Sequence, residues 1–257
     1  MISEYFRPAT VDEAVTLLTD RRVIRKPLAG GTSLSRQQTG VQGVVDLQAA
    51  GLDQIVTRAQ RITAGAMSRL SVLLHHPDIH PEIKRAIRID TGQNLRNMAT
   101  LGGTLVSADG RSILSAVMLA LDATLTWEPD GNKISLGNWL PLREQESPGV
   151  LITEVAWSFQ PTLTFEYAAR SPKDQPILIV AATQWGSGRT RIVLGGFGKT
   201  PVVAMDGLEE GGADVAARNA YFEAEDQWAS ASYRREVAAK LALRCLQKID
   251  VLKERED

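Results

Sequence analysis

Two glycine-rich stretches constrain the fold of this chain more than any other feature. The first, Ala29–Leu34, reads Ala-Gly-Gly-Thr-Ser-Leu, and the second, Ala99–Thr104, reads Ala-Thr-Leu-Gly-Gly-Thr. Glycine has no Cβ and can adopt positive φ, so successive backbone N–H groups in such a stretch can converge on an anion. Two separate loops of this kind suit a diphosphate held between them.

Neither stretch is a common nucleotide motif. The sequence has no G-x-G-x-x-G and no G-x-x-x-x-G-K-[ST], which excludes the Rossmann fingerprint and the P-loop. A single Gly-Gly pair is more often a turn or a bulge. The interpretation therefore depends on the two stretches together with their neighbours in the chain.

Taken together, these motifs resemble the FAD-binding subunit of the molybdenum hydroxylases, the family that includes the medium subunit of aerobic carbon monoxide dehydrogenase and the flavin domain of xanthine dehydrogenase. The resemblance covers nearly the whole chain, and the matching stretches follow in the same order: Tyr5–Ala14, Leu28–Leu34, Val44–Leu47, Gly65–Met67, Arg96–Gly103, Leu119–Ala123 and Ser232–Arg235.

The resemblance implies an α+β chain with the vanillyl-alcohol-oxidase/PCMH-like FAD-binding fold. Two α/β lobes are expected, an N-terminal FAD-binding lobe at 1–57 and a second FAD-binding lobe at 58–157. A C-terminal α+β domain with an antiparallel sheet and helices is expected at 158–257.

The family also implies where the cofactor lies. Its two glycine stretches hold the pyrophosphate and ribityl chain of FAD, and an aliphatic side chain packs against the flavin ring. Leu151 or Ile152 falls at that aliphatic position, although a core role explains either residue equally well. The residues expected at FAD are Lys26, Leu28, Ala29, Gly30, Gly31, Thr32, Ser33, Leu34, Ala99, Thr100, Gly102, Gly103, Thr104, Ser107, Leu151 and Ile152.

Two positions depart from the family pattern. Ile113 stands where the family usually places an Asp that hydrogen-bonds the flavin nucleotide, and isoleucine cannot accept a hydrogen bond. Tyr167 stands where the family commonly has a Lys that stabilises negative charge on a reduced flavin. Weakened FAD binding or altered redox behaviour would follow.

Composition and charge exclude several classes of function. The formal net charge is -1, so no global field favours nucleic acid or an anionic membrane. Cys245 is the only cysteine, which rules out a cysteine-ligated iron–sulfur cluster within this chain. His75, His76 and His80 have no carboxylate spacing that would complete a metal site. We expect no metal ligands and no catalytic side chains, and non-covalent FAD because no His or Cys lies beside either glycine stretch.

The N-terminus lacks a charged lead followed by an apolar core, and no run of about eighteen apolar residues occurs, so we expect no signal peptide, no membrane span and a cytoplasmic location.

The resemblance implies an electron-transfer subunit of a hetero-oligomer. An iron–sulfur subunit with 2Fe-2S clusters and a molybdopterin-binding subunit with the molybdenum cofactor are the expected partners. Two alternatives stay open: a flavin-free relative kept as an assembly or scaffold subunit, and a stand-alone FAD oxidoreductase.

The sequence pattern predicts several elements directly. Thr10 and Glu13 predict the start of a helix, and Ser68 or Ser71 is expected to cap another through Leu74. Further elements expected are strands at 23–28, 44–47, 54–57, 61–66 and 151–157, helices from Pro81, at 113–121 and at 232–249, hairpins at 125–136 and 177–195, and a solvated charged tail at 253–257.

Overall fold

The computed structural model describes residues 2–20, 22–34, 42–145, 147–172, 174–208 and 211–254. The chain divides into two compact units, each assembled from discontinuous segments: residues 1–79, 91–107 and 124–157 in the first, and residues 80–90, 108–123 and 158–257 in the second. Both units combine helices and sheets, which confirms the predicted α+β class. The division into three domains at residues 57 and 157 stays a prediction.

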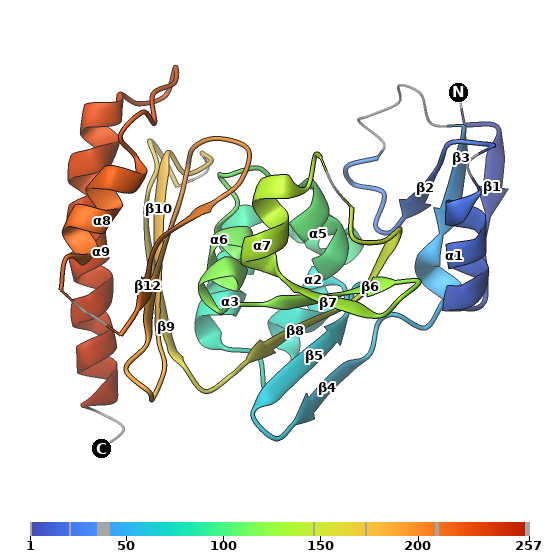
Figure 1. The fold of residues 1–257 in the computed structure, drawn as a ribbon, viewed down its shortest axis with the longest axis horizontal. Coiled ribbons are helices and arrows are strands. Elements are labelled where there is room, and N and C mark those ends of the chain that lie inside the picture. Colours follow the sequence, from blue (N-terminus) through green and yellow to red (C-terminus); the bar gives the residue numbers. More distant parts are fainter. Residues whose placement is uncertain are drawn as a thin grey trace. The chain divides into compact units, whose positions relative to one another are not determined.

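A three-stranded parallel sheet and one helix form the N-terminal part of the first unit (Figure 1). Its strand order is β1-β3-β2, and both outer strands run parallel to β3. The elements are β1 (Glu4–Phe6), α1 (Val11–Thr19), β2 (Arg25–Leu28) and β3 (Gly43–Asp46). Thr10 Oγ1 accepts a hydrogen bond from the N–H of Glu13 at 3.2 Å, which confirms the predicted helix start.

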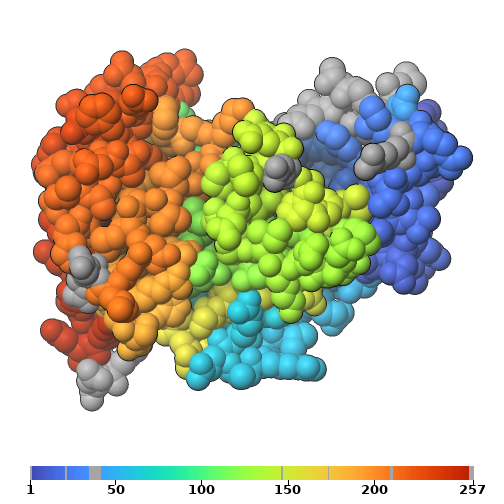
Figure 2. Space-filling view, in the orientation of Figure 1, coloured from blue at the N-terminus to red at the C-terminus, as the bar shows by residue number. Residues whose placement is uncertain are grey.

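The first unit also contains a five-stranded sheet, in which the strand order is β4-β5-β8-β6-β7. Its members are β4 (Ile55–Arg58), β5 (Arg61–Gly65), β6 (Thr124–Glu128), β7 (Asn132–Ser135) and β8 (Leu151–Ser158). Strands β6 and β7 pair antiparallel around a turn in which Gly131 has φ +65°, as the Pro-Asp-Gly sequence predicts. Residues of this hairpin and of the following helix, in yellow-green, form part of the surface in Figure 2.

Short helices connect these strands: η1 (Leu47–Ala49), α2 (Leu70–His75), α4 (Gln93–Met98), α5 (Leu101–Ser107), α7 (Leu136–Trp139) and η2 (Leu140–Leu142). The predicted serine cap of α2 is wrong. Arg69 occupies the cap position without a side-chain hydrogen bond, and Ser71 lies inside the helix. Ser68 Oγ donates instead to the carbonyl oxygen of Asp53 at 3.2 Å, because the chain is still paired with neighbouring segments at that point.

The second unit contains a four-stranded antiparallel sheet with the order β12-β11-β10-β9. Its strands are β9 (Thr162–Ala168), β10 (Leu178–Gln184), β11 (Thr190–Gly195) and β12 (Val202–Gly207). The β10–β11 pair confirms the predicted hairpin, with Gly188 at φ +85° in the turn.

Helices cover both faces of this sheet, namely α3 (Pro81–Asp90), α6 (Ile113–Ala120), α8 (Ala213–Ala220) and α9 (Ala231–Lys253). One face packs against α8 and α9, and α6 contacts β10 and β11. Every residue of α6 is buried, as its apolar sequence predicts. Helix α9 extends beyond the predicted range at its C-terminal end, and the charged tail at 255–257 lies outside the described residues.

None of the helices in the described part of the chain is both long enough and apolar enough to cross a membrane.

Candidate functional site

The structure brings the two glycine stretches together in the first unit. A Cβ atom added to Gly30 would lie 1.9 Å from the carbonyl oxygen of Met98, closer than any real contact. A Cβ on Gly103 would lie 3.6 Å from the Cβ of Ala29. The backbone of residues 29–30 therefore packs directly on the start of the second stretch, and only glycine fits at position 30.

The first stretch is an open loop that follows β2. Gly31 has φ +69°, a conformation that favours glycine. Within the described part of the chain, no acceptor takes a hydrogen bond from the N–H groups of residues 30–33. Binding of a ligand by these N–H groups stays a prediction.

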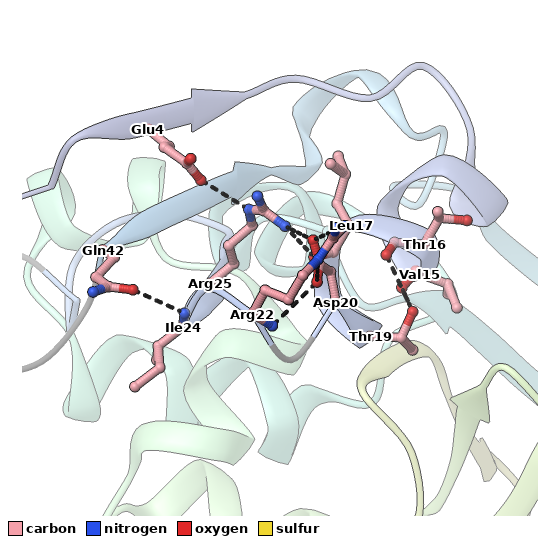
Figure 3. Close-up of polar contacts among 10 residues, drawn as sticks. All are labelled: Glu4, Val15, Thr16, Leu17, Thr19, Asp20, Arg22, Ile24, Arg25 and Gln42. Atoms are coloured by element: carbon pink, nitrogen blue, oxygen red, sulfur yellow. Dashed lines mark hydrogen bonds and ion pairs between the residues drawn. The ribbon is translucent and has the colours of Figure 1, made fainter.

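A buried arginine at the start of β2 anchors the segment that leads into this loop (Figure 3). Arg25 Nε donates to Glu4 at 3.0 Å, and its Nη1 donates to Asp20 at 3.1 Å and to the carbonyl oxygen of Leu17 at 3.3 Å. Hydrogen bonds from Arg22 and then from Arg25 hold the pKa of Asp20 well below its usual range. The guanidinium of Arg25 thus ties β2 to β1 and to the end of α1.

The second stretch has a different construction. Thr100 pairs with Arg69 in an antiparallel bridge, and Leu101 begins helix α5. The N–H of Leu101 donates to Ser68 O at 2.9 Å and the N–H of Gly102 to Ala66 O at 2.9 Å. Thr100 Oγ1 caps the helix by accepting the N–H of Gly103 at 3.2 Å. The expectation of free N–H groups is therefore wrong for residues 101–103.

The glycines of the second stretch serve close packing. A Cβ on Gly102 would lie 2.7 Å from the Cβ of Ala66, and one on Gly103 would lie 2.9 Å from Thr100 Oγ1. Positive φ is found at Gly31 but at neither Gly102 nor Gly103. Gly103 therefore does not use the positive φ that glycine allows, because this residue lies in a regular helix.

A cavity of about 280 Å³ opens where the two stretches meet. Segments of both stretches line it, together with the residues after β1, around η1 and before α2. The lining residues are Arg7, Ala29, Gly30, Gln48, Leu52, Asp53, Met67, Arg69, Met98 and Thr100. Two guanidinium groups and one carboxylate give this lining an excess of positive charge.

Asp46 organises one side of the cavity. Its carboxylate is 3% exposed and accepts hydrogen bonds from the Tyr5 hydroxyl and from the N–H of Gln48, the latter at 3.0 Å. The hydrogen bond from Tyr5 to this carboxylate raises the pKa of Tyr5. Arg7 Nε lies 4.0 Å from Asp46, so Arg7 reaches the cavity beside an anchored counter-charge.

Of the residues expected at FAD, Ala29, Gly30 and Thr100 line the cavity, and the others are not in its lining. Lys26 is exposed on β2, and Ser107 Oγ donates to Gly103 O at 2.7 Å. Leu151 is 3% exposed and belongs to an apolar cluster with Met67, while Ile152 is 6% exposed and pairs with Trp127 of β6. Leu28, Gly31, Thr32, Ser33, Leu34 and Thr104 are half-buried.

The list of residues expected at FAD missed the charged part of the cavity. Asp53 and Arg69 carry no local motif that marks them as ligand-facing. Arg7, Met67 and Met98 had a signal, because all three lie in stretches that carry the resemblance.

The two positions that depart from the family pattern lie in the second unit. Ile113 is fully buried at the first turn of α6, and its N–H donates to Asp90 at 2.9 Å. Ser112 Oγ and the N–H of Leu114 also donate to Asp90, both at 2.8 Å. Burial raises the pKa of Asp90 to about 6 in spite of these bonds. Tyr167 is half-buried on β9 opposite Ile179.

The cavity lining contains no His or Cys, and the described residues contain no group of three or more His, Cys, Asp or Glu side chains able to hold a metal ion. Cys245 is buried in α9, and its thiol contacts Val180 O at 3.6 Å.

Comparison with known proteins gives consistent results. The family described as the FAD binding domain in molybdopterin dehydrogenase matches residues 1–156. The chain is 27% identical to the uncharacterized protein YgfM of Escherichia coli strain K12, over 94% of each chain. It is 30% identical to the 6-hydroxypseudooxynicotine dehydrogenase complex subunit alpha of Paenarthrobacter nicotinovorans, covering 77% of this chain and 74% of that one.

Solved structures show the same fold. A chain of the reconstituted CO dehydrogenase from Oligotropha carboxidovorans superimposes with a TM-score of 0.80 at 24% identity, over 96% of this chain and 97% of that chain. A chain of quinoline 2-oxidoreductase from Pseudomonas putida 86 gives 0.77 at 22% identity, over 97% and 96%. These similarities confirm the expected fold.

Proposed function

This chain belongs to the family of FAD-binding domains of molybdopterin dehydrogenases, and we propose that it is the FAD-binding electron-transfer subunit of a molybdenum hydroxylase. In this role it receives electrons from iron–sulfur clusters of a partner subunit and passes them to an external acceptor. Oxidation of the organic substrate belongs to a molybdopterin-binding partner.

The observation that carries the proposal is the contact between the two glycine stretches at a positively charged cavity. Gly30, whose N–H has no acceptor among the described residues, lines this cavity together with Arg7 and Arg69, and backbone N–H and guanidinium groups are the donors that a diphosphate requires. Whole ligand sites usually measure about 300–1,000 Å³, so a cavity of about 280 Å³ suits one portion of a dinucleotide such as its diphosphate. The donor set therefore fits FAD.

FAD supplies the redox chemistry when it is bound, and the side chains of this protein supply binding and orientation. We assign the diphosphate to the first stretch and the nearby cationic side chains. Thr100 lines the cavity from the second stretch, and the glycines of α5 pack against Ala66 and Thr100 behind it. The absence of His and Cys from the cavity lining supports non-covalent binding.

The need for partners is supported by the cysteine count and by the relatives. A single buried cysteine cannot ligate an iron–sulfur cluster, so the proposed electron donor lies outside these 257 residues. One relative is named as a subunit of a dehydrogenase complex, and another, from Sulfolobus acidocaldarius, is named glyceraldehyde dehydrogenase medium chain. We propose an iron–sulfur subunit and a molybdopterin-binding subunit as partners here.

The test begins with the purified protein. Its visible spectrum should show flavin, acid should release FAD, and the apoprotein should regain the spectrum on titration with FAD. The natively expressed protein should then co-purify with chains that contain iron and molybdenum.

A colourless protein that gains no flavin absorbance with excess FAD would contradict the proposal in favour of the scaffold alternative. Ile113 and Tyr167 are the departures from the family pattern that give this alternative its specific support. A chain that migrates alone and oxidises an organic substrate unaided would instead favour a stand-alone oxidoreductase.

A further inference from the structure

We propose that Arg7 and Arg69 determine the preference of the cavity for a diphosphate-bearing ligand over a neutral flavin. The proposal rests on the proposed function and assigns two side chains that neither the glycine motifs nor the comparisons identify. In this proposal the two arginine side chains select for the charge of the phosphates, whereas the backbone of the glycine stretches determines the shape of the cavity.

The fold fixes the backbone of Arg69 beside the second glycine stretch. Arg69 has extended φ and ψ of -69° and 144° immediately before α2, and it pairs with Thr100. The N–H of Leu70 donates to Ala99 O at 3.0 Å and the N–H of Leu101 to Ser68 O at 2.9 Å, on either side of that pair. The side chain of Arg69 therefore starts from a rigid position at the cavity.

Arg69 has no ionic partner in the part of the chain that the structure describes. Among the described residues, none forms an ion pair or a side-chain hydrogen bond with its guanidinium group. Many guanidinium groups in this chain are paired, for example Arg25 with Glu4 and Arg191 with Asp206. An unpaired guanidinium at a cavity is available for an anionic ligand.

Arg7 reaches the same cavity from another segment. It lies between Phe6 of β1 and the buried Pro8, and a residue before proline is restricted to extended conformations. Its guanidinium lies 4.0 Å from Asp46, a distance that leaves its donors free for a ligand. The side chain of Arg7 is 54% exposed, and Arg69 is exposed as well. We expect the weaker contribution from Arg7, because the Asp46 carboxylate already lies beside its guanidinium.

The chemistry of this pair matches a diphosphate. Each guanidinium can donate two parallel hydrogen bonds to phosphate oxygens, and two such groups balance a dianion. Asp53 in the lining and Asp46 beside Arg7 both oppose an anion, so binding of a diphosphate depends on the two guanidinium groups that offset these carboxylates. Riboflavin, which has no phosphate, would leave both guanidinium groups unused.

The experiment compares FAD, FMN and riboflavin as ligands of the full-length apoprotein. Dissociation constants are measured by flavin fluorescence for the wild type and for Arg69→Ala, Arg7→Ala, Arg69→Lys and Arg7→Lys. We expect Arg69→Ala to weaken FAD about tenfold or more and Arg7→Ala by a smaller factor, while riboflavin affinity stays unchanged. The lysine variants should recover part of the loss, and the salt dependence of FAD binding should decrease in both alanine variants.

Arg61→Ala is the matched control, because Arg61 is an exposed arginine of β5 that does not line the cavity. Urea unfolding of each variant checks that the fold is retained. Unchanged FAD affinity in both alanine variants would overturn the inference and leave the flavin function intact. Parallel losses for FAD and riboflavin would also overturn it, because the arginines would then only support the shape of the cavity.

Failure of the flavin function itself gives a different result. If the wild type binds neither FAD nor riboflavin, the variants are titrated with ADP. Binding of ADP that depends on Arg69 would retain the diphosphate preference without a flavin, and no binding of ADP would overturn both proposals.

Discussion

The two glycine stretches share the same dipeptide and meet at one cavity, yet they use it for different purposes. In the first stretch, Gly31 adopts positive φ and the N–H groups of residues 30–33 have no acceptor among the described residues. In the second, the N–H groups of residues 101–103 are bonded within the protein, and the glycines lie in a helix. One stretch has backbone donors that no described residue uses, and the other is closely packed and fully bonded at residues 101–103.

The comparison shows that a Gly-Gly pair does not by itself indicate a phosphate cradle. The decisive property is whether neighbouring segments already use the N–H groups. For Leu101 and Gly102 the acceptors lie on residues 68 and 66, which are distant in the sequence. Substitutions that affect either the ligand affinity of the first stretch or the packing of the second stretch therefore test this difference.

The largest effect is expected for Gly30→Val. Its Cβ would meet the Met98 carbonyl oxygen at 1.9 Å, and this backbone atom cannot rotate away. The stretches must separate, so we expect FAD affinity to fall roughly a hundredfold or more, with a loss of stability of about 1–3 kcal/mol. Flavin titration and urea unfolding measure the two effects. Gly92→Ala is the control, because a Cβ at Gly92 meets nothing within 4 Å. Retained FAD affinity in Gly30→Val would show that the contact between the stretches is dispensable.

The starts of α5 and α6 are bonded by different groups. A neutral hydroxyl, that of Thr100, accepts an N–H at the start of α5, whereas the carboxylate of Asp90 accepts N–H groups at the start of α6 in the second unit. Folding raises the pKa of Asp90 from 3.8 to about 6, so between these values the folded state holds a proton that the unfolded state releases. The free energy of unfolding should therefore fall as pH rises through this window, by at most about 3 kcal/mol, since each unit of pKa is worth about 1.4 kcal/mol.

Unfolding of wild type and of Asp90→Asn between pH 4 and 7 measures this slope. Asp109, which also raises the pKa of Asp90, is present in both proteins. The difference in stability between them should change with pH, whereas Thr100→Val, which removes the neutral cap of α5, should shift stability equally at every pH. A constant difference for Asp90→Asn would mean that this carboxyl titrates normally.

The third effect separates the two glycines of the second stretch. Gly102→Ala places a Cβ 2.7 Å from the Cβ of Ala66, so we expect a loss of about 1–3 kcal/mol. In Gly103→Ala the gain in helix propensity, up to about 1 kcal/mol, opposes crowding of Thr100 Oγ1, so the net change should be smaller. Urea midpoints of the two variants provide the measurement. A larger loss for Gly103→Ala would reverse the packing roles given to these residues.

The smallest effect is expected for Asp53→Asn. Removing the carboxylate from the cavity lining should tighten FAD binding by up to about fivefold, since exposed charge interactions are worth about 0.2–1 kcal/mol. Asp130→Asn, in the exposed turn of the β6–β7 hairpin, should leave FAD affinity unchanged. Weaker binding in Asp53→Asn would instead indicate that this carboxylate accepts hydrogen bonds from ligand hydroxyls.

Local sequence patterns predicted much of the fold. The cap at Thr10, the apolar helix α6 and the hairpins β6–β7 and β10–β11 follow from short-range chemistry, and the structure has all of them. The same rules failed at α2, because Ser68 and Ser71 are both suitable cap residues by type. The choice of Arg69 as the cap position depends on the pairing of residues 68–70 with 99–101, which no local pattern contains.

The site was predictable only in part, because it too depends on contacts between segments that are distant in the sequence. The resemblance identified the two stretches, but Arg7, Asp53 and Arg69 reach the cavity through folding of distant segments. Glycines at 102 and 103 suggested a turn because of their low helix propensity. Hydrogen bonds to Ala66 and Ser68 make this segment a helix despite that propensity.

The contact between Gly30 and Met98 also determines when the protein can acquire its cofactor during synthesis. The cavity needs segments nearly seventy residues apart, and the first unit is completed only by residues 124–157, after chain that belongs to the second unit has been made. A ribosome-bound chain that ends before β8 contains every residue that lines the cavity but lacks a strand of the five-stranded sheet in the first unit. We therefore expect the flavin to be loaded after β8 has been translated, and an earlier truncation product to leave the ribosome without cofactor.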